Sequence, residues 1–136
     1  MNVNVGDRIP DWVVDSVDAE KMKTMAALLR DPNPIHWDVE SVKRLGMGDR
    51  VVNQGPNNMA YVVNALMSWA GGDPAAIRSV QVRFQGNVLA GDRVTAGGEV
   101  TEVREEGGRR IAVCAVWLDR DDGTRLLAGT AEVAVA

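Results

Sequence analysis

The sequence predicts one α+β domain, with helices in the first half of the chain and an antiparallel sheet in the second. A chain of 136 residues has the length of one ordinary domain and can bury one hydrophobic core. Near Ile77 the spacing of apolar residues changes from a helical period to the alternation typical of strands. Turn-forming residues then separate several apolar segments, as expected for a sheet built from neighbouring strands.

The first predicted helix follows Asp18, whose side chain can cap a helix N-terminus. Four apolar residues after it recur at the spacing of one helix face: Met22, Met25, Ala26 and Leu29. This helix must end near Arg30, because Pro32 disfavours helical dihedral angles at Asp31.

Two further helices are expected before the sheet. One spans residues 39–45, with Asp38 as its N-cap and Gly46 as its terminator. The longest spans residues 56–70 and opens with Pro56, which is tolerated there because the first helical N–H has no intrahelical partner. The polar residues beside its apolar face are expected at the surface or at an interface: Asn57, Asn58, Tyr61 and Asn64.

The sheet is predicted from segments with a period of two residues. Apolar and polar residues alternate over residues 80–85, and further strands are expected over residues 94–103, 111–118 and 125–135. A short N-terminal strand over residues 12–17 completes the sheet. Because segment 111–118 is apolar on both faces, we expect it at the centre of the sheet, covered on both sides.

Composition excludes several classes of function. The net charge is -4 and the positive charges are scattered, so nucleic acid is not an expected partner. The N-terminus lacks the apolar core of a secretion signal and no apolar stretch reaches membrane-spanning length, so we expect a cytoplasmic protein without a membrane contact. With Cys114 as the one cysteine and His36 as the one histidine, neither an internal disulfide nor a zinc cluster is expected.

The segment Asp31 to His36 carries an acid and a base five residues apart in a loop stiffened by two prolines. Fully extended, such a segment would span roughly 17 Å, so the two side chains meet only if the loop turns back. A carboxylate and an imidazole that converge on one water can pass a proton in each direction, as reversible hydration requires. From the residues alone, a structural role stays open: Asp31 would end the first helix and His36 would be a satisfied polar group.

Three stretches of this chain resemble the MaoC-like hydratase and dehydratase family. The run DPNPIHWD, from Asp31 to Asp38, is similar to the D-x-N-P-[LIV]-H hydratase motif of that family. The long helix led by Gly55 and the run VRFQGNVLAGD, from Val82 to Asp92, agree with the family in order and spacing. The resemblance covers nearly the whole chain.

The resemblance implies a hot-dog fold over residues 1–136, in which an antiparallel sheet wraps a long central helix. It implies that Asp31 and His36 bind the catalytic water and that the backbone N–H of Gly55 binds the thioester carbonyl. A helix N-terminus suits that role, because its N–H groups are unpaired and its potential is positive. Members of the family pair through their sheets, which implies a homodimer or larger assembly, or a heterodimer with a related subunit.

Some residues depart from the pattern of the family. Arg30 stands where a glycine is usual before the aspartate, and Gln54 replaces a histidine before Gly55. Pro56 removes an N–H next to Gly55, so these changes affect the surroundings of the carbonyl. We take Asn33, Gln54 and Gly55 as candidate substrate-binding residues; Asn33 could equally hold the loop through its own backbone.

The function implied is that of a lyase that hydrates enoyl thioesters or dehydrates 3-hydroxyacyl thioesters, linked to CoA or to acyl carrier protein. No cofactor and no metal are expected, because the reaction moves only water and protons. Two alternatives remain: a non-catalytic hot-dog subunit of a heteromeric dehydratase, and a hot-dog acyl-thioesterase.

Overall fold

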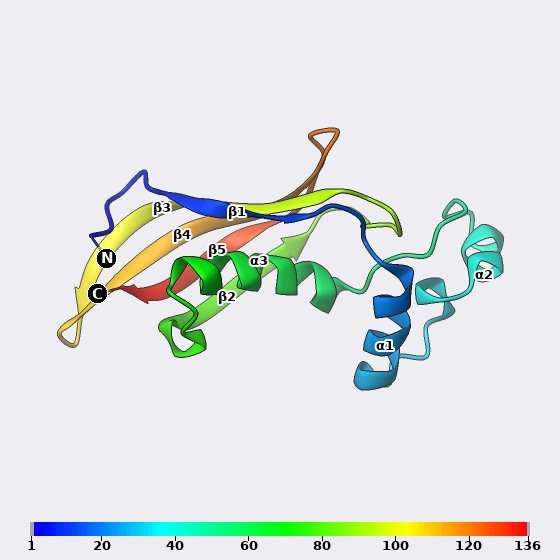
Figure 1. The fold of residues 1–136 in the computed structure, drawn as a ribbon, viewed down its shortest axis with the longest axis horizontal. Helices are drawn as coiled ribbons and strands as arrows, with labels where there is room; N and C mark the ends of the chain where they lie inside the picture. Colours follow the sequence, from blue (N-terminus) through cyan, green and yellow to red (C-terminus); the bar gives the residue numbers. More distant parts are fainter. Residues whose placement is uncertain (1, 136) are drawn as a thin grey trace.

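The computed structural model describes residues 2–135, which form one five-stranded antiparallel sheet with a helix across it (Figure 1). The strand order is β1-β3-β4-β5-β2, so the first and second strands lie at the two edges. The strands are β1 (Arg8–Val14), β2 (Ile77–Phe84), β3 (Val94–Glu106), β4 (Arg109–Arg120) and β5 (Arg125–Val135). The change of period at Ile77 therefore marks the start of a strand, as predicted.

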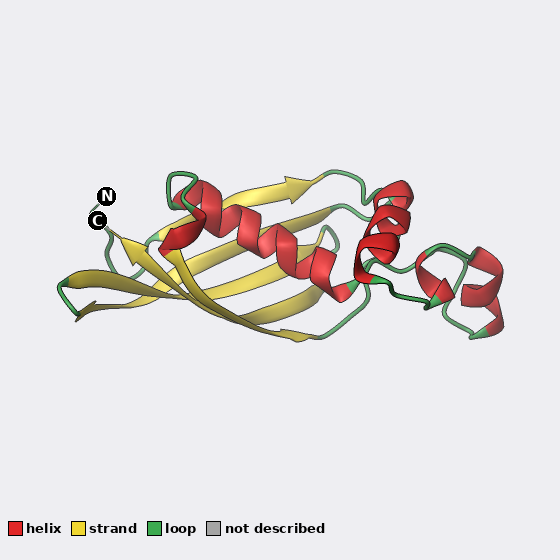
Figure 2. Ribbon diagram, turned by 90° about the horizontal axis from the view of Figure 1, so that it is seen from below, coloured by secondary structure: helices red, strands yellow, loops and turns green. Residues whose placement is uncertain are grey.

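The long helix α3 (Gly55–Trp69) crosses one face of the sheet and contacts every strand (Figure 2). Its buried residues Val62, Ala65 and Leu66 pack into the same core as the inward-facing residues of the sheet, such as Leu118 of β4. Burial of this apolar face is the main stabilising contribution to the arrangement. It fixes the helix N-terminus at the end of the sheet where α1 begins.

Strand β4 lies at the centre of the sheet, as predicted, but it is not fully covered on both of its faces. Its inward-facing residues, among them Cys114 and Val116, are buried, whereas Val113, Ala115 and Trp117 on the outer face are half-buried. Within the single chain, the outer face of β4 is thus only partly covered. The apolar pattern on both faces of β4 led to an expectation of cover on both sides, but a single copy of the chain fully covers only the inner face.

The predicted N-terminal strand was misplaced by several residues. It spans Arg8–Val14 as β1, at the edge of the sheet beside β3, where Pro10 costs no ladder hydrogen bond on its open side. The register with β3 shifts between Ile9 and Trp12. The end was placed too late because Val17 is buried without being in the strand: its N–H donates to the carbonyl of Asp92 instead.

Three short helical segments lie at the end of the molecule near the start of α3, beyond the sheet (Figures 1 and 2). They are α1 (Ala19–Leu29), η1 (Pro34–His36) and α2 (Val39–Arg44). Asp18 and Asp38 cap α1 and α2 as predicted, each accepting a hydrogen bond from the backbone two residues on. Within residues 2–135, no helix is both long and apolar enough to cross a membrane.

Candidate active site

The loop between α1 and η1 brings Asp31 into place through an unusual backbone conformation at Arg30. Arg30 has φ 51°, in the left-handed region, where it forms the C-cap of α1. The N–H of Asp31 donates to the carbonyl of Ala26 at 3.0 Å, which turns the chain back against the helix end. Glycine is the residue that this conformation favours.

Arg30→Gly should stabilise the fold. A side chain in the left-handed region costs about 1 kcal/mol or more, and the greater freedom of glycine in the unfolded chain offsets part of that gain. We expect the free energy of unfolding to rise by about 0.5 kcal/mol, measured by urea unfolding. Arg30→Ala keeps the backbone strain and serves as the control, so an equal gain in both variants would contradict this explanation.

Asn33 holds the loop through its own backbone. Its N–H donates to Oδ1 of Asp31 at 2.9 Å, and its side-chain Oδ1 accepts a hydrogen bond from the N–H of Ile35 at 3.3 Å. The second bond caps the 3₁₀ helix η1, which ends at His36. Of the two roles open to Asn33, the structure therefore provides the loop-holding one, and a contact with substrate remains a proposal.

The turned loop brings the acid and the base together. Nε2 of His36 lies 3.2 Å from Oδ2 of Asp31, and Nδ1 of His36 lies 2.6 Å from the carbonyl oxygen of Val52. The side chain of His36 is 9% exposed and that of Asp31 is 29% exposed. The imidazole is thus enclosed, while the carboxylate keeps contact with solvent.

These two contacts determine where the protons of His36 must be. A carbonyl oxygen only accepts hydrogen bonds, so Nδ1 carries a hydrogen and donates it to Val52. A neutral imidazole would then present a lone pair on Nε2 to a carboxylate oxygen, which is an unfavourable contact. One proton between Nε2 and Oδ2, which lie 3.2 Å apart, would satisfy both atoms.

One extended segment, residues 51–55, joins this pair to the start of α3. The N–H of Val52 donates to the carbonyl of Ile35 at 2.9 Å, and the N–H of Asn53 donates to the carbonyl of Val88 at 2.7 Å. The same segment that accepts the His36 hydrogen bond therefore leads, three residues later, to Gly55. The distance between the acid/base pair and the helix N-terminus is set by this short stretch.

The side chain of Gln54 faces the interior of the protein. It is 1% exposed, its Nε2 donates to the carbonyl of Met22 in α1 at 2.7 Å, and its Oε1 accepts a hydrogen bond from Asn57 at 3.0 Å. Each end of the amide makes one hydrogen bond within the protein. Both ends of the amide thus help to join α1 to α3, and a contact between Gln54 and substrate remains a proposal.

A buried network of amides continues from Gln54, and sequence reasoning missed it. Asn53 donates to Oδ1 of Asn58 at 2.9 Å and to the hydroxyl of Tyr61 at 3.1 Å. Asn58 was expected at the surface or at an interface, but it is only 4% exposed and lies inside the single chain. Burial raises the pKa of Tyr61 above its ordinary value, against the opposing effect of its hydrogen bond with Asn53. The clustering of three asparagines and a tyrosine at one helix start was the available signal.

Gly55 is the first residue of α3 and its N–H has no partner within the helix. Gln54, at the N-cap, makes no side-chain capping bond, and Pro56 has no N–H to offer. A Cβ at Gly55 would lie 3.1 Å from Cζ of Phe84, the last residue of β2. Sequence reasoning assigned Phe84 to the buried face of its strand, yet it is 50% exposed.

The rest of the described chain offers no second centre of this kind. Among residues 2–135, no group of three or more His, Cys, Asp or Glu side chains is arranged to hold a metal ion. Burial raises the pKa of the Cys114 thiol to about 11, so this thiol stays protonated at neutral pH. Cys114 is therefore a small core residue rather than a nucleophile.

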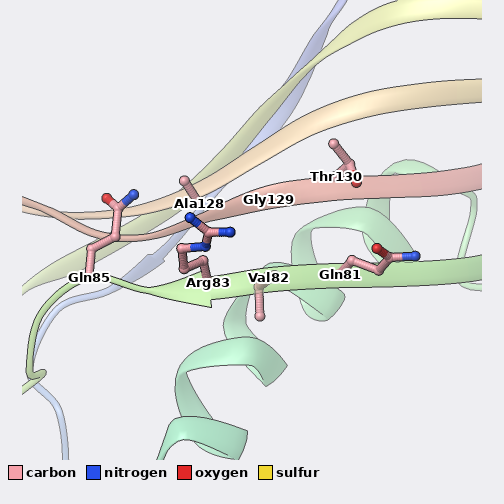
Figure 3. Close-up of a pocket in the computed structure, with 7 residues that line it drawn as sticks. All are labelled: Gln81, Val82, Arg83, Gln85, Ala128, Gly129 and Thr130. Carbon is pink, nitrogen blue, oxygen red and sulfur yellow. The ribbon is translucent and has the colours of Figure 1, made fainter.

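A hollow of about 450 Å3 lies along the edge strand β2 and its neighbour β5 (Figure 3). It is lined by Gln81, Val82, Arg83, Gln85, Ala128, Gly129 and Thr130. In Figure 3, Val82 points to the other side of the strand from Arg83. The lining includes neither Asp31, His36 nor Gly55, and the chemistry of the acid/base pair is a better guide to the site than this hollow.

Comparisons with known proteins agree with the geometry. The family described as MaoC like domain matches residues 6–116. The structure of an (R)-hydratase from A. caviae involved in PHA biosynthesis is similar at 25% identity and a TM-score of 0.86, over 98% of each chain. A structure described as MaoC-like dehydratase is similar at 25% identity and a TM-score of 0.87, over 99% of this chain and 41% of that chain.

A third similar structure is that of the ChsH1-ChsH2 complex from Mycobacterium tuberculosis, at 24% identity and a TM-score of 0.82 over the full length of both chains. No curated protein sequence matches the chain. The five-stranded sheet around α3 and its likeness to these structures confirm the predicted α+β hot-dog fold. The extent of the family match leads to one identification: this chain belongs to the MaoC-like domain family.

Proposed function

We propose that the protein is a hydro-lyase that hydrates enoyl thioesters and dehydrates 3-hydroxyacyl thioesters, with Asp31 and His36 as the groups that bind the reacting water. The observation that carries this proposal is the 3.2 Å contact between Nε2 of His36 and Oδ2 of Asp31. A pair that holds one proton can accept a second proton and release the first. The (R)-hydratase likeness supports the same class of reaction.

In the direction of hydration, Asp31 and His36 together hold a water molecule beside their 3.2 Å contact, and the oxygen of that water attacks C3 of the enoyl group. One member of the pair accepts a proton from the water, and the shared proton passes to C2, so the pair ends with the proton count that it began with. Negative charge develops on the thioester carbonyl oxygen during the attack. The free N–H of Gly55, at the positive end of α3, stabilises that oxygen.

Asn33 and Gln54 contribute to the proposed site mainly by holding it in shape. Asn33 fixes the carboxylate of Asp31 through its N–H, and Gln54 ties the turn before Gly55 to α1. The carrier of the acyl group is CoA or acyl carrier protein. The steps require no metal and no redox cofactor, because only water and protons are exchanged.

We further propose that residues 1–136 work as one hot-dog domain that pairs with a second subunit. The edge strand β2 has one neighbour, β5, and the outer face of the sheet is half open in the single chain. Open edges and faces of this kind favour assembly. The second subunit is another copy of this chain or a related chain, as the ChsH1-ChsH2 complex illustrates for its own proteins.

The proposed activity is tested by incubating the protein with enoyl-CoAs of increasing chain length. We expect the absorbance of the conjugated enoyl thioester to fall without release of free thiol, and the change to be reversed from the 3-hydroxyacyl-CoA. Release of free CoA thiol would indicate a thioesterase instead. Absence of any turnover, with acyl-CoA still bound, would indicate a non-catalytic subunit.

A further inference from the structure

Phe84 differs from the other inward-facing residues of β2. Val80 and Val82, on the same face of the same strand, are half-buried and pack against the core. Phe84 is 50% exposed and is not part of that packing. A large aromatic ring that is half exposed gives up much of the free energy that its burial would provide. Core packing therefore does not account for an aromatic ring at residue 84.

The partner of the ring is the backbone of Gly55. A Cβ built on Gly55 would lie 3.1 Å from Cζ and 3.4 Å from Cε1 and Cε2 of Phe84. Gly55 does not have a positive φ, so its backbone does not by itself require glycine. The lack of a side chain at residue 55 leaves room for the ring to lie against the first residue of α3.

We propose that Phe84 is a specificity-determining residue, which limits the size of the substituent on the acyl carbon next to the thioester carbonyl. This inference rests on the proposed function of Gly55 as the donor to that carbonyl. A carbonyl oxygen bound to the Gly55 N–H would lie about 2.9 Å from the nitrogen. The ring and the carbonyl then both lie against Gly55, so the ring contacts atoms within one or two bonds of the carbonyl carbon.

Such a contact affects substrates unequally. A straight acyl chain has only hydrogens on C2 and fits beside the ring, whereas a methyl group on C2 meets the ring edge. One methyl group in an apolar pocket changes discrimination by roughly 10–200-fold. Removal of the ring should therefore raise the affinity and kcat/KM for the branched substrate relative to the straight one. A general weakening of the fold would not change that ratio.

The test compares Phe84→Ala and Phe84→Leu with the wild type on paired ligands. Binding is measured with butyryl-CoA and isobutyryl-CoA, and turnover with crotonyl-CoA and 2-methylcrotonyl-CoA. We expect the ratio of branched to straight ligand, in affinity and in kcat/KM, to rise roughly tenfold in Phe84→Ala and less in Phe84→Leu. Val82→Ala, on the same strand face but packed in the core, is the control and should leave both ratios unchanged.

The two measurements separate this inference from the proposed function. If the wild type binds both saturated ligands but turns over neither enoyl-CoA, the proposed function fails and the binding ratio still decides the role of Phe84. Unchanged ratios in a folded Phe84→Ala or Phe84→Leu variant would overturn the inference, and so would a wild type that binds neither butyryl-CoA nor isobutyryl-CoA. Should Phe84→Ala not fold, Phe84→Leu alone carries the comparison.

Discussion

His36→Gln should lower the rate of enoyl-CoA hydration by roughly 10²–10⁴-fold, which is the usual contribution of a positioned acid or base. The glutamine amide can still donate a hydrogen bond toward the carbonyl of Val52, but it cannot hold the proton that His36 shares with Asp31. Asp31→Asn should cause a loss of the same order. Its side-chain oxygen can still accept the N–H of Asn33, so the loop should keep its shape.

The rate losses caused by Asp31→Asn and His36→Gln should not multiply in the double variant. In the proposed mechanism Asp31 and His36 act on the same proton. Loss of either one should then remove the function of both, and the double variant should be only slightly worse than the poorer single variant. Asp38→Asn is the control, since Asp38 lies in the same region but caps α2. It should keep near wild-type turnover. Steady-state kinetics on the best enoyl-CoA, with circular dichroism to check the fold, measures all four variants.

Binding separates a chemical role from a structural one. Butyryl-CoA should bind the Asp31→Asn and His36→Gln variants about as well as the wild type, because its carbonyl still meets the N–H of Gly55. Near wild-type turnover in both folded single variants would show that the pair is structural, and the proposed mechanism would then be wrong. Weaker binding without a fall in kcat would lead to the same conclusion.

The sequence predicted the elements whose signals are local. Asp18 and Asp38 cap helices through bonds to residues two positions away, and the alternation that begins at Ile77 needs only its own strand. The loop from Asp31 to His36 also turns back as its two prolines allowed, which brings the two side chains within 3.2 Å, while their role in catalysis stays a proposal. Each of these features depends on contacts between residues that are near neighbours in the sequence, so the sequence alone can indicate them.

Contacts between distant parts of the chain could not be predicted in the same way. Gln54 is buried because it reaches the carbonyl of Met22, 32 residues earlier, and His36 is oriented by Val52, 16 residues later. Nothing near Gln54 in the sequence indicates either its partner or its burial. Phe84 fits the alternation of its strand, yet at the end of that strand its ring is half exposed and lies against Gly55, 29 residues earlier.

A second large effect is expected from Gly129→Ala, on the stability of the fold. Gly129 in β5 pairs with Val82 in β2, and a Cβ on Gly129 would overlap the carbonyl oxygen of Gln81. It would also lie 2.8 Å from Cα of Val82. These are backbone atoms, so no side-chain rotation can relieve the overlap. We expect the free energy of unfolding to fall by about 3 kcal/mol or more, measured by urea unfolding.

Gly97→Ala is the matched control, because Gly97 also lies in a strand of the sheet, without a positive φ. A Cβ there would meet the ends of two side chains, Nε1 of Trp117 at 3.0 Å and Oδ1 of Asp11 at 3.1 Å. Side chains can shift where backbone cannot, so the loss should be smaller, at about 1 kcal/mol. Equal losses would show that β2 and β5 do not approach as closely as described. A larger loss in Gly129→Ala would show that the close pairing of β2 with β5 requires glycine at residue 129. The position of Phe84, at the end of β2, depends on the same pairing.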